Sequence, residues 1–514
     1  MSIILSDQDK STLRTAAYGT VSLMAAASGA PHKSAANAVI ALTSATGLVG
    51  HVLAARTKDI ELIGTTVAEL ADRVFPALTA AMRVLGAQAP AESDNFRGTV
   101  LRAVEAAQTH SDKPGYAMVE MARKITAVLD SAGSTAVVTT AAAGQDRPEL
   151  RRAIEEIIDS GFVGVSVRVR DERGEWAGSA GVAELGGTAK PPIDGHVRIA
   201  SNTKTFTAAL VLRLVAEGKL GLDIPVVAYL PEFALDERIT VRMLLQHTSG
   251  IFNFTGELYA DGTIVAGIPA PGTPWGGQWV DDRFHTYRPQ ELVELALSKP
   301  TRFEPGTGWS YSNTNYALAR LLIEKVTGRS FAEEMRRLIL EPLALSGTLV
   351  PDSPEVPEPH AHAYYRYEED GRDTTVDITR HDPSWNPSGG DMISTTRDLA
   401  TFISALNSGK LLPAELLSEM RTPFPTGIPG MGYGLGVFVQ ETACGGTVIT
   451  HNGGHAGYAT LMYATPDGSK TMTASLTCVD DSAMSIAAPF QLAQQRLVSE
   501  VFCGGQADLA QPTP

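Results

Sequence analysis

Helical spacing of apolar residues dominates the first 130 positions of the chain. Apolar side chains recur every three or four residues, and small residues, mainly alanine, occupy the remaining faces. Turn-forming segments at 29–31, 88–90 and 111–115 interrupt this pattern. We therefore predict helices over residues 10–27, 34–55, 63–74, 77–85, 96–108 and 117–129. Because small side chains allow helices to pack closely, residues 1–130 are predicted to form an all-α module.

Residues 131–145 lack periodicity and are predicted to be a linker, because they are small and polar. Beyond them, helical spacing and strand alternation follow each other along the chain. Strands are predicted at 162–170, 176–182, 195–199, 434–440, 446–451, 458–464 and 471–477, and a last helix at 483–501. This order favours an α/β (α+β) domain over 146–505, with an antiparallel sheet flanked by helices and a helical lobe, and a tail at 506–514.

Composition narrows the functional classes. The chain has 514 residues, with 44% apolar and 19% charged residues, as in soluble globular proteins of two or three domains. Its net charge of −15 argues against nucleic acid and anionic membranes as partners. No apolar run reaches the roughly 20 residues that span a bilayer. The apolar segment near residues 16–27 begins late and is too polar for a signal peptide, so we interpret it as a helix.

A serine lies where the predicted strand 195–199 runs into a helix that ends at Gly218. Unpaired N–H groups at a helix N-terminus favour an oxyanion there. Lys204 follows Ser201 by three residues, so its amine projects from the same helical face. A desolvated, neutral lysine can remove the proton of a serine hydroxyl. Taken alone, the spacing is more typical of a helix-capping serine that is followed by a solvated lysine.

Two further motifs follow in order, Tyr311-Ser312-Asn313 and His451-Asn452-Gly453. The framing phrases are His247-Thr-Ser-Gly, Pro305-Gly306, Gly389-Gly390 and Tyr433-Gly-Leu-Gly. With these motifs, residues 146–505 resemble the serine penicillin-recognising family, which includes D-alanyl-D-alanine carboxypeptidases, class C β-lactamases and related D-peptidases and esterases. The likeness is greatest to the secreted carboxypeptidase type. It implies a β-lactamase/DD-peptidase-like fold for this domain.

The resemblance also implies the roles of the site residues. Ser201 would form an acyl-enzyme, and Lys204 would orient it and keep Tyr311 partly ionised by its charge. Tyr311 would relay the proton, Asn313 would bind the substrate amide and Lys204, and His451 would keep the site electropositive. The N–H groups of Ser201 and Gly454 would form the oxyanion hole. The expected substrate-binding residues are Trp385, Asn452, Gly453 and, from the aromatic stretch 254–286, Tyr259. No metal or organic cofactor is required.

Several residues leave more than one interpretation. Trp385 is either a core residue or an aromatic wall of the pocket. His247 is interpreted as a structural residue at a helix end. His360, His362 and His455 lack carboxylate partners at the spacing of metal ligands, so we interpret them as surface histidines.

Two departures from the resemblance bear on the substrate. The carboxypeptidases carry an arginine on the strand before the Cys444 loop, where this chain reads Val437-Phe438-Val439. Their hydroxyl residues around the histidine motif are also replaced here. Both groups hold the free carboxylate of the substrate, so their loss weakens the case for a D-Ala terminus.

The motifs and the two departures are compatible with three functions. The first is a D-stereospecific carboxypeptidase or transpeptidase of the D-Ala-D-Ala type, with β-lactams as covalent inhibitors. The second is an esterase or acyltransferase with the same residues, acting on a small ester. The third is a catalytically silent sensor or scaffold whose active part is the helical module. That module is a candidate docking or oligomerisation element for an unidentified protein partner.

The three cysteines are Cys444, Cys478 and Cys503, and their odd number allows at most one internal pair. The sequence alone leaves the pairing open. The resemblance implies a bridge between Cys444 and Cys503, with Cys478 free. Such a bridge needs an oxidising compartment, whereas the N-terminus offers no clear signal peptide. The location therefore stays open between extracytoplasmic and cytoplasmic.

Overall fold

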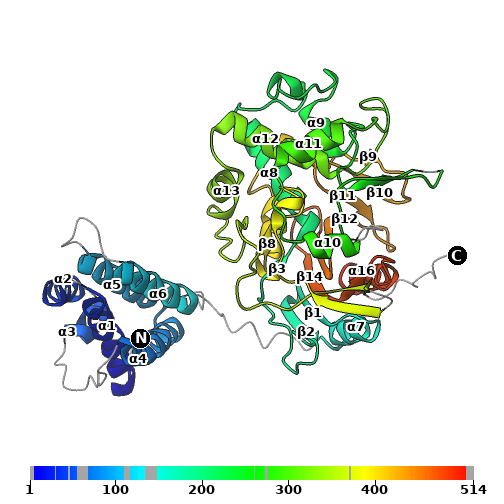
Figure 1. Ribbon diagram of the computed structural model, residues 1–514. Coiled ribbons are helices and arrows are strands. Elements are labelled where there is room, and N and C mark those ends of the chain that lie inside the picture. Colours follow the sequence, from blue (N-terminus) through cyan, green and yellow to red (C-terminus); the bar gives the residue numbers. More distant parts are fainter. Residues whose placement is uncertain are drawn as a thin grey trace. The chain divides into compact units, whose positions relative to one another are not determined.

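The computed structural model describes residues 5–28, 30–43, 47–54, 67–108, 116–133, 147–259, 261–271, 276–369 and 372–504. The chain divides into two compact units, Met1–Ala143 and Gly144–Pro514 (Figure 1). The part of the predicted linker beyond Gly133 and the predicted tail at 506–514 lie outside the described residues. None of the described helices combines the length and apolarity that crossing a bilayer requires.

The described part of the first unit is entirely helical. Its helices are α1 Asp7–Ala26, α2 Pro31–Thr43, α3 Gly47–Ala54, α4 Val67–Gln88, α5 Pro90–Gln108 and α6 Tyr116–Gly133. The prediction of two helices at 63–74 and 77–85 is wrong, because α4 continues through Pro76. Val74, Leu78 and Leu85 are fully buried on either side of this proline, and we attribute the continuity of the helix to their packing.

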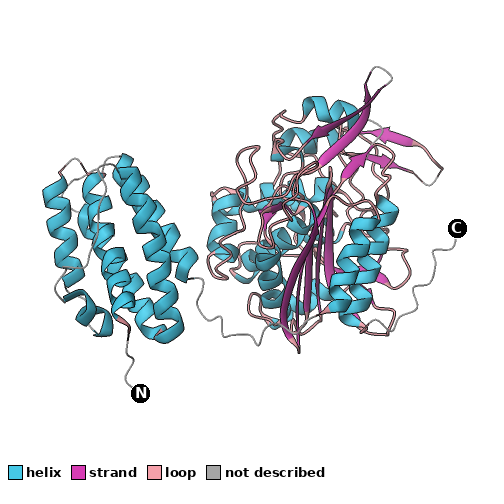
Figure 2. Cartoon of the chain, turned by 90° about the horizontal axis from the view of Figure 1, so that it is seen from below, coloured by secondary structure: helices cyan, strands magenta, loops and turns pink. Residues whose placement is uncertain are grey.

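An eight-stranded antiparallel sheet is the centre of the second unit (Figure 2). Its strand order is β2-β1-β14-β13-β12-β11-β10-β9. The strands are β1 Gly164–Asp171, β2 Gly174–Gly181, β9 Phe424–Pro425, β10 Met431–Tyr433, β11 Phe438–Glu441, β12 Thr447–His455, β13 Tyr458–Ala464 and β14 Thr471–Thr477. The predicted antiparallel sheet with flanking helices is confirmed, and two of its strands, β13 and β14, match the predicted bounds.

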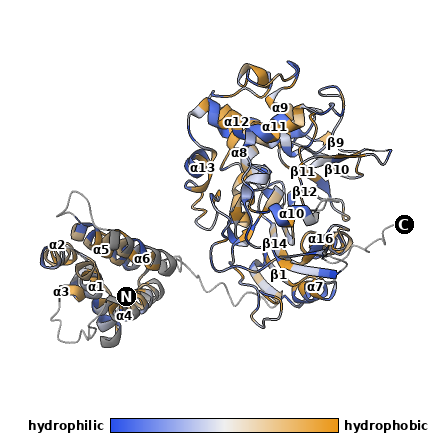
Figure 3. Cartoon of the chain, viewed as in Figure 1, coloured by the Kyte–Doolittle hydropathy of each residue, from blue (hydrophilic) through white to orange (hydrophobic). Residues whose placement is uncertain are grey.

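Helices pack on both faces of this sheet. On one face, α7 Pro148–Asp159 and α16 Ala487–Phe502 share a core with β1, β13 and β14, which includes Ile154, Leu461 and Leu497. The core of the other face contains the almost fully buried α8 Thr203–Ala216. The remaining helices are α9 Val241–Gln246, α10 Gly276–Asp282, α11 Pro289–Leu297, α12 Asn313–Thr327, α13 Phe331–Met335, α14 Thr396–Asn407 and α15 Ala414–Arg421. Helices α11 and α12 carry both hydrophobic and hydrophilic positions (Figure 3).

Smaller sheets complete the unit. They are β3 Val197–Arg198 with β8 Ile393–Ser394, β4 Gly256–Leu258 with β5 Ile264–Ala266, and β6 Tyr364–Glu369 with β7 Arg372–Asp377 and β15 Val479–Asp481. The predicted strand at 195–199 is thus short and pairs outside the main sheet. The stretch 254–286, predicted to be irregular, contains β4, β5 and α10.

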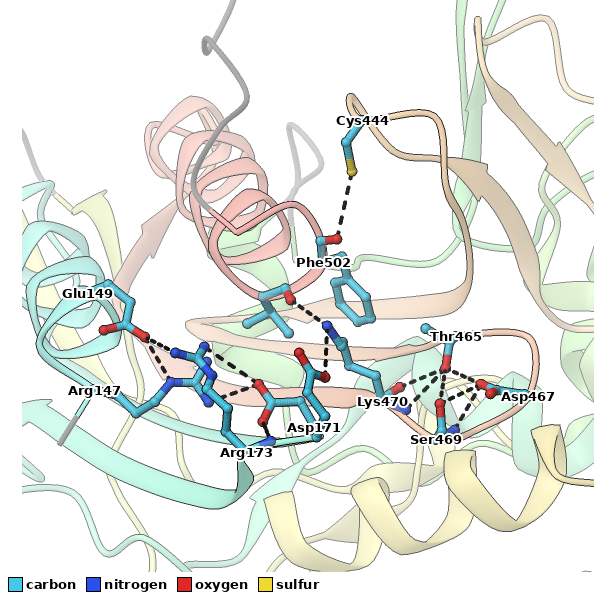
Figure 4. Close-up of polar contacts among 12 residues, drawn as sticks. Arg147, Glu149, Asp171, Arg173, Cys444, Thr465, Asp467, Ser469, Lys470 and Phe502 are labelled. Atoms are coloured by element: carbon cyan, nitrogen blue, oxygen red, sulfur yellow. Dashed lines mark hydrogen bonds and ion pairs between the residues drawn. The ribbon is translucent and has the colours of Figure 1, made fainter. Parts of the chain in front are cut away.

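Contacts with neighbouring segments hold the C-terminal end of α16 in place, and Figure 4 shows the polar ones. Cys503, just after the helix, forms a disulfide with Cys444 in the turn between β11 and β12, and their Cα atoms lie 5.7 Å apart. Lys470 Nζ donates a hydrogen bond to the Val501 carbonyl at 3.4 Å. Cys478 is free and buried. The structure therefore contains the bridge that the resemblance implied.

Candidate active site

Ser201 lies in the tight turn Ala200–Asn202, directly before α8. Ala200 has a φ of 45°, a left-handed conformation that costs energy for a residue with a side chain. Neighbouring hydrogen bonds hold the turn in place. The Ile199 N–H donates to Met392 at 3.0 Å, and Asn202 Nδ2 donates to Thr460 Oγ1 at 2.6 Å. The strain is thus located next to the predicted nucleophile, where such strain is often functional.

Gly453 lets β12 approach this turn closely. A Cβ atom at Gly453 would lie 2.2 Å from the Ile199 carbonyl oxygen and 3.0 Å from Ala200 Cβ. Any side chain here would push the strand and the Ser201 turn apart. Gly453, which the sequence suggested as a substrate contact, therefore has a packing role that needs no substrate.

Lys204 is fully buried on the first turn of α8. Its Nζ lies 2.7 Å from both Asn313 Oδ1 and the Gly389 carbonyl oxygen, and 3.3 Å from Ser201 Oγ. Burial holds the pKa of Lys204 well below its ordinary value, and the Asp391 carboxylate opposes this shift. Two of the three contacts are carbonyl oxygens, which only accept hydrogen bonds. A neutral Lys204 can therefore give each of them one N–H and turn its lone pair toward Ser201.

Tyr311 contacts the nucleophile from the other side. Its Oη donates a hydrogen bond to Ser201 Oγ at 2.9 Å, and Lys204 Nζ lies 4.7 Å from the ring centroid. Burial raises the pKa of the Tyr311 phenol above its ordinary value, and the bond to Ser201 only partly opposes this rise. Desolvation disfavours the charged form of both groups, which favours a protonated Tyr311 over the partly ionised one that the resemblance implies.

His451 lies beside these residues as an uncharged side chain. Its Nδ1 donates to the Asn452 carbonyl at 2.9 Å and its Nε2 accepts from Tyr433 Oη at 3.1 Å, and these partners assign the tautomer. Burial and the charge of Lys204 lower the pKa of His451 to about 3. This shift disfavours a positive charge on His451, and its expected part in keeping the site electropositive stays a prediction.

The site opens along one edge of β12. Strand β11 pairs with β12 only as far as Thr450, so residues 451–455 have no strand partner on that edge among the described residues. Gly454 is exposed, and a Cβ there would meet nothing within 4 Å. The backbone N–H groups of Ser201 and Gly454 stay the predicted oxyanion donors.

Two of the predicted substrate contacts lie elsewhere. The Asn452 side chain donates to Tyr463 Oη at 2.8 Å, on the face of β12 opposite His451. Successive residues of a strand alternate between its faces, so the Asn452 side chain lies away from His451, and its role in substrate binding stays a prediction. The Tyr259 ring packs against the Arg302 guanidinium, 4.1 Å from the ring centroid. None of its described contacts is with Ser201, Lys204 or Tyr311.

Trp385 packs against the hydrophobic core and also lines a pocket, so both of its interpretations stay open. It lines a pocket together with Gly454 and His455, and its ring centroid lies 4.7 Å from that of His455. His455 is buried, with its Nε2 2.6 Å from His381 Nε2, so its interpretation as a surface histidine is wrong. The partner is 74 positions away in the sequence, which local spacing could not reveal.

His247 supports Tyr311 without contacting Ser201. It ends α9 in a left-handed conformation, with a φ of 61°, and its Nδ1 accepts hydrogen bonds from the Ser312 N–H at 3.2 Å and Asn315 Nδ2 at 3.1 Å. Its ring packs 4.3 Å from that of Tyr311, centroid to centroid. These contacts agree with its interpretation as a structural residue.

Sequence reasoning missed two groups around Lys204. The Gly389 carbonyl is one of its acceptors, and Asp391 is a buried carboxylate whose pKa is raised by desolvation. The sequence shows the pair Gly389-Gly390 next to Asp391, but it does not show that these residues lie around Lys204. The described residues include no cluster of three or more His, Cys, Asp or Glu that could hold a metal ion.

Known proteins match this chain over its second unit. The Beta-lactamase family model matches residues 150–492. Penicillin-binding protein 4* of Bacillus subtilis is 29% identical over 57% of this chain and 63% of its own length. Esterase EstB of Burkholderia gladioli is 28% identical over 49% of this chain and 69% of its own length. The chain therefore spans less than two thirds of the length of the first of these relatives.

A solved structure gives a fuller match. The D-stereospecific amidohydrolase from Streptomyces sp. is 35% identical, with a TM-score of 0.60, and the match covers 70% of this chain and 99% of that one. The predicted resemblance and its fold are confirmed by these matches.

Proposed function

Because this chain belongs to the β-lactamase family of serine hydrolases, we propose that it is a D-stereospecific amidohydrolase that forms an acyl-enzyme at Ser201. The observation that carries this proposal is the chain of contacts from Lys204 Nζ to Ser201 Oγ to Tyr311 Oη, at 3.3 and 2.9 Å. The likeness to the Streptomyces amidohydrolase supports the substrate class.

Acylation would begin with neutral Lys204 as the base. As Ser201 Oγ attacks the carbonyl carbon, its proton passes to Lys204 Nζ, which becomes an ammonium held by Asn313 Oδ1 and the Gly389 carbonyl. The oxyanion would be held by the N–H groups of Ser201 and Gly454. The protonated Tyr311 would then donate its proton to the leaving nitrogen, and the amine departs.

Deacylation would restore both groups. A water molecule adds to the acyl carbon and gives a proton to the Tyr311 phenolate. When the ester bond breaks, Ser201 Oγ takes the proton back from Lys204. The sum is an amide and water converted to an acid and an amine, with both side chains returned to their starting forms.

The surroundings of His451 favour an uncharged group beyond the scissile bond. Phe438, on the strand where the resemblance would place an arginine, packs 5.4 Å from the His451 ring, centroid to centroid. Among the described residues, Lys204 is the only lysine or arginine that contacts Ser201, Tyr311 or His451. A terminal carboxylate would find no guanidinium there. An amide is thus better supported than the narrower D-Ala-D-Ala carboxypeptidase or transpeptidase.

An esterase is the second candidate, because the apolar environment at Phe438 suits an ester equally well. The similarity of this chain to Esterase EstB supports this second candidate. The two candidate activities differ in their need for a proton donor. An amine leaves only after it is protonated, whereas an activated alcohol can leave as an anion.

The test is turnover of D-phenylalanine amide, its L-enantiomer, a D-Ala-D-Ala peptide and p-nitrophenyl acetate by the wild-type protein. The proposal predicts hydrolysis of the D-amide above the L-amide and the D-Ala-D-Ala peptide. Turnover of the ester alone would support the esterase. A fluorophosphonate or a penicillin should form an adduct at Ser201, and Ser201→Ala is the control. If no substrate is turned over and no adduct forms, the result would support the third function, a catalytically silent sensor or scaffold.

A further inference from the structure

A pocket of about 310 Å³ lies beside Gly454, the predicted oxyanion donor. It is bounded by the turn between β12 and β13, by Trp385 and by the residues that lead into α16. Its wall is mostly apolar and includes Phe162, Trp385, Tyr458 and Phe490. Gly453 touches the Ser201 turn and the next residue, Gly454, lines the pocket, so the pocket follows the turn along β12.

Among the described residues, Asp480 is the only charged side chain that lines this pocket. One of its oxygens accepts the Asp481 N–H at 2.9 Å, and no described cation forms an ion pair with it. The adjacent Asp481 differs, because Arg366 Nη2 lies 2.8 Å from its carboxylate. Arg366 is thus already engaged, and Asp480 lines the apolar pocket without an ion-pair partner among the described residues.

The histidine of the pocket adds no positive charge. His455 is buried against Trp385, and its Nε2 is taken up by His381 at 2.6 Å. Burial, and the nearby charge of Arg198, lower the pKa of His455 to about 3. The pocket therefore presents an apolar surface and one uncompensated negative charge.

We propose that this pocket binds a substrate group that combines an apolar surface with a protonated amine, such as the ammonium end of a short D-peptide whose scissile amide lies at Ser201. The ammonium donates charge-assisted hydrogen bonds to Asp480, while Trp385 and Phe490 contact its apolar part. A carboxylate is repelled at this position, and an acylated amine lacks the charge that Asp480 attracts. The inference rests on the proposed function and specifies its substrates.

The test compares substrates with a free and an acetylated amine. D-alanyl-D-phenylalanine amide and a D-tripeptide amide that ends in D-phenylalanine amide are each measured with their N-acetyl counterparts. For at least one pair, the wild-type protein should hydrolyse the free amine with a kcat/KM roughly tenfold higher. In Asp480→Asn this ratio should fall close to one, mainly through KM. Asp481→Asn removes the same charge from the neighbouring residue and should keep the ratio, as should Asp480→Glu.

Equal turnover of both members of each pair by the wild type would overturn the inference, and so would an unchanged ratio in Asp480→Asn. If no amide is hydrolysed, the proposed function has failed, and the pocket is judged by binding alone. Trp385 fluorescence then follows titrations with 2-phenylethylamine and 2-phenylethanol, with Trp385→Phe as the control. Tighter binding of the amine by the wild type, lost in Asp480→Asn, supports the inference. Equal binding of the two compounds, or no binding, overturns it.

Discussion

The two units bury different kinds of side chain. In the helical unit, the buried residues of the described part are apolar or carry small hydroxyl groups, apart from Arg14. The second unit buries Lys204, His247, His451 and Asp391 close to one strained turn. Burying polar groups costs stability unless they find partners. The contrast separates a unit whose core serves folding from one whose core also holds reactive groups at lowered or raised pKa values.

Replacing Lys204 should produce the largest loss of activity. Lys204→Met fills the same space without a base, so kcat should fall by about 10³-fold. A matched control is Lys219→Met, which changes a partly exposed lysine beyond the end of α8. Steady-state hydrolysis of a D-amide measures the effect. Activity within about threefold of the wild type would remove Lys204 from the chemistry.

Replacing Tyr311 should reduce the hydrolysis of amides much more than the hydrolysis of esters. In Tyr311→Phe, kcat for a D-amide should fall about 10²-fold, because the leaving nitrogen loses its proton donor. Hydrolysis of p-nitrophenyl acetate should fall much less, since its leaving group departs as an anion. Equal losses on both substrates would contradict the assignment of Tyr311 as the acid.

The disulfide should affect stability in the second unit only. Cys444 and Cys503 are 59 positions apart, and opening a loop of that size costs about 4 kcal/mol in the chain-entropy model. Replacing both residues by serine should lower the melting temperature of the catalytic unit, and leave the unfolding transition of the helical unit in place. Calorimetry of the full chain measures the unfolding transitions of the two units separately. A shift in the helical transition would show that the units are energetically coupled.

A core substitution in the helical unit should have the smallest effect on catalysis. Leu78 is fully buried in α4, so Leu78→Ala should destabilise that unit by about 3 kcal/mol. We expect kcat and KM for a D-amide to stay within about twofold, because this core contains no residue of the active site. A large change in either constant would break the comparison between the units.

The sequence predicted most of the catalytic fold, because alternation over β13 and β14 and the spacing within α8 are local signals. It also brought Ser201, Lys204 and Tyr311 together, since their motifs resemble one family. It failed for His455, whose partner His381 is remote in sequence. It also left open on which face the Asn452 side chain lies and in which direction the pKa values of the buried groups shift, because both depend on register and packing that no spacing reveals.

The buried lysine also makes stability depend on pH. Since its folded pKa lies below the unfolded value, the unfolded chain binds more protons between the two. The free energy of unfolding should therefore rise with pH in that window and level off above the ordinary value of about 10.4. The stability difference between the wild type and Lys204→Met, measured by urea unfolding across this range, should show this slope. A difference independent of pH would mean that Lys204 is charged in the folded protein.

The most direct test of a neutral Lys204 as the base is the rate of Ser201 labelling by a fluorophosphonate as a function of pH. The reagent needs no protonated leaving group, so the rate reports how readily Ser201 loses its proton. We predict that the rate rises with pH through a single ionisation well below the ordinary lysine value. We also expect this ionisation to be absent in Lys204→Met, and no step from His451 near pH 6.5, since its pKa is lowered to about 3. A rate that rises only near the ordinary lysine pKa, or one that is unchanged in Lys204→Met, would contradict the account.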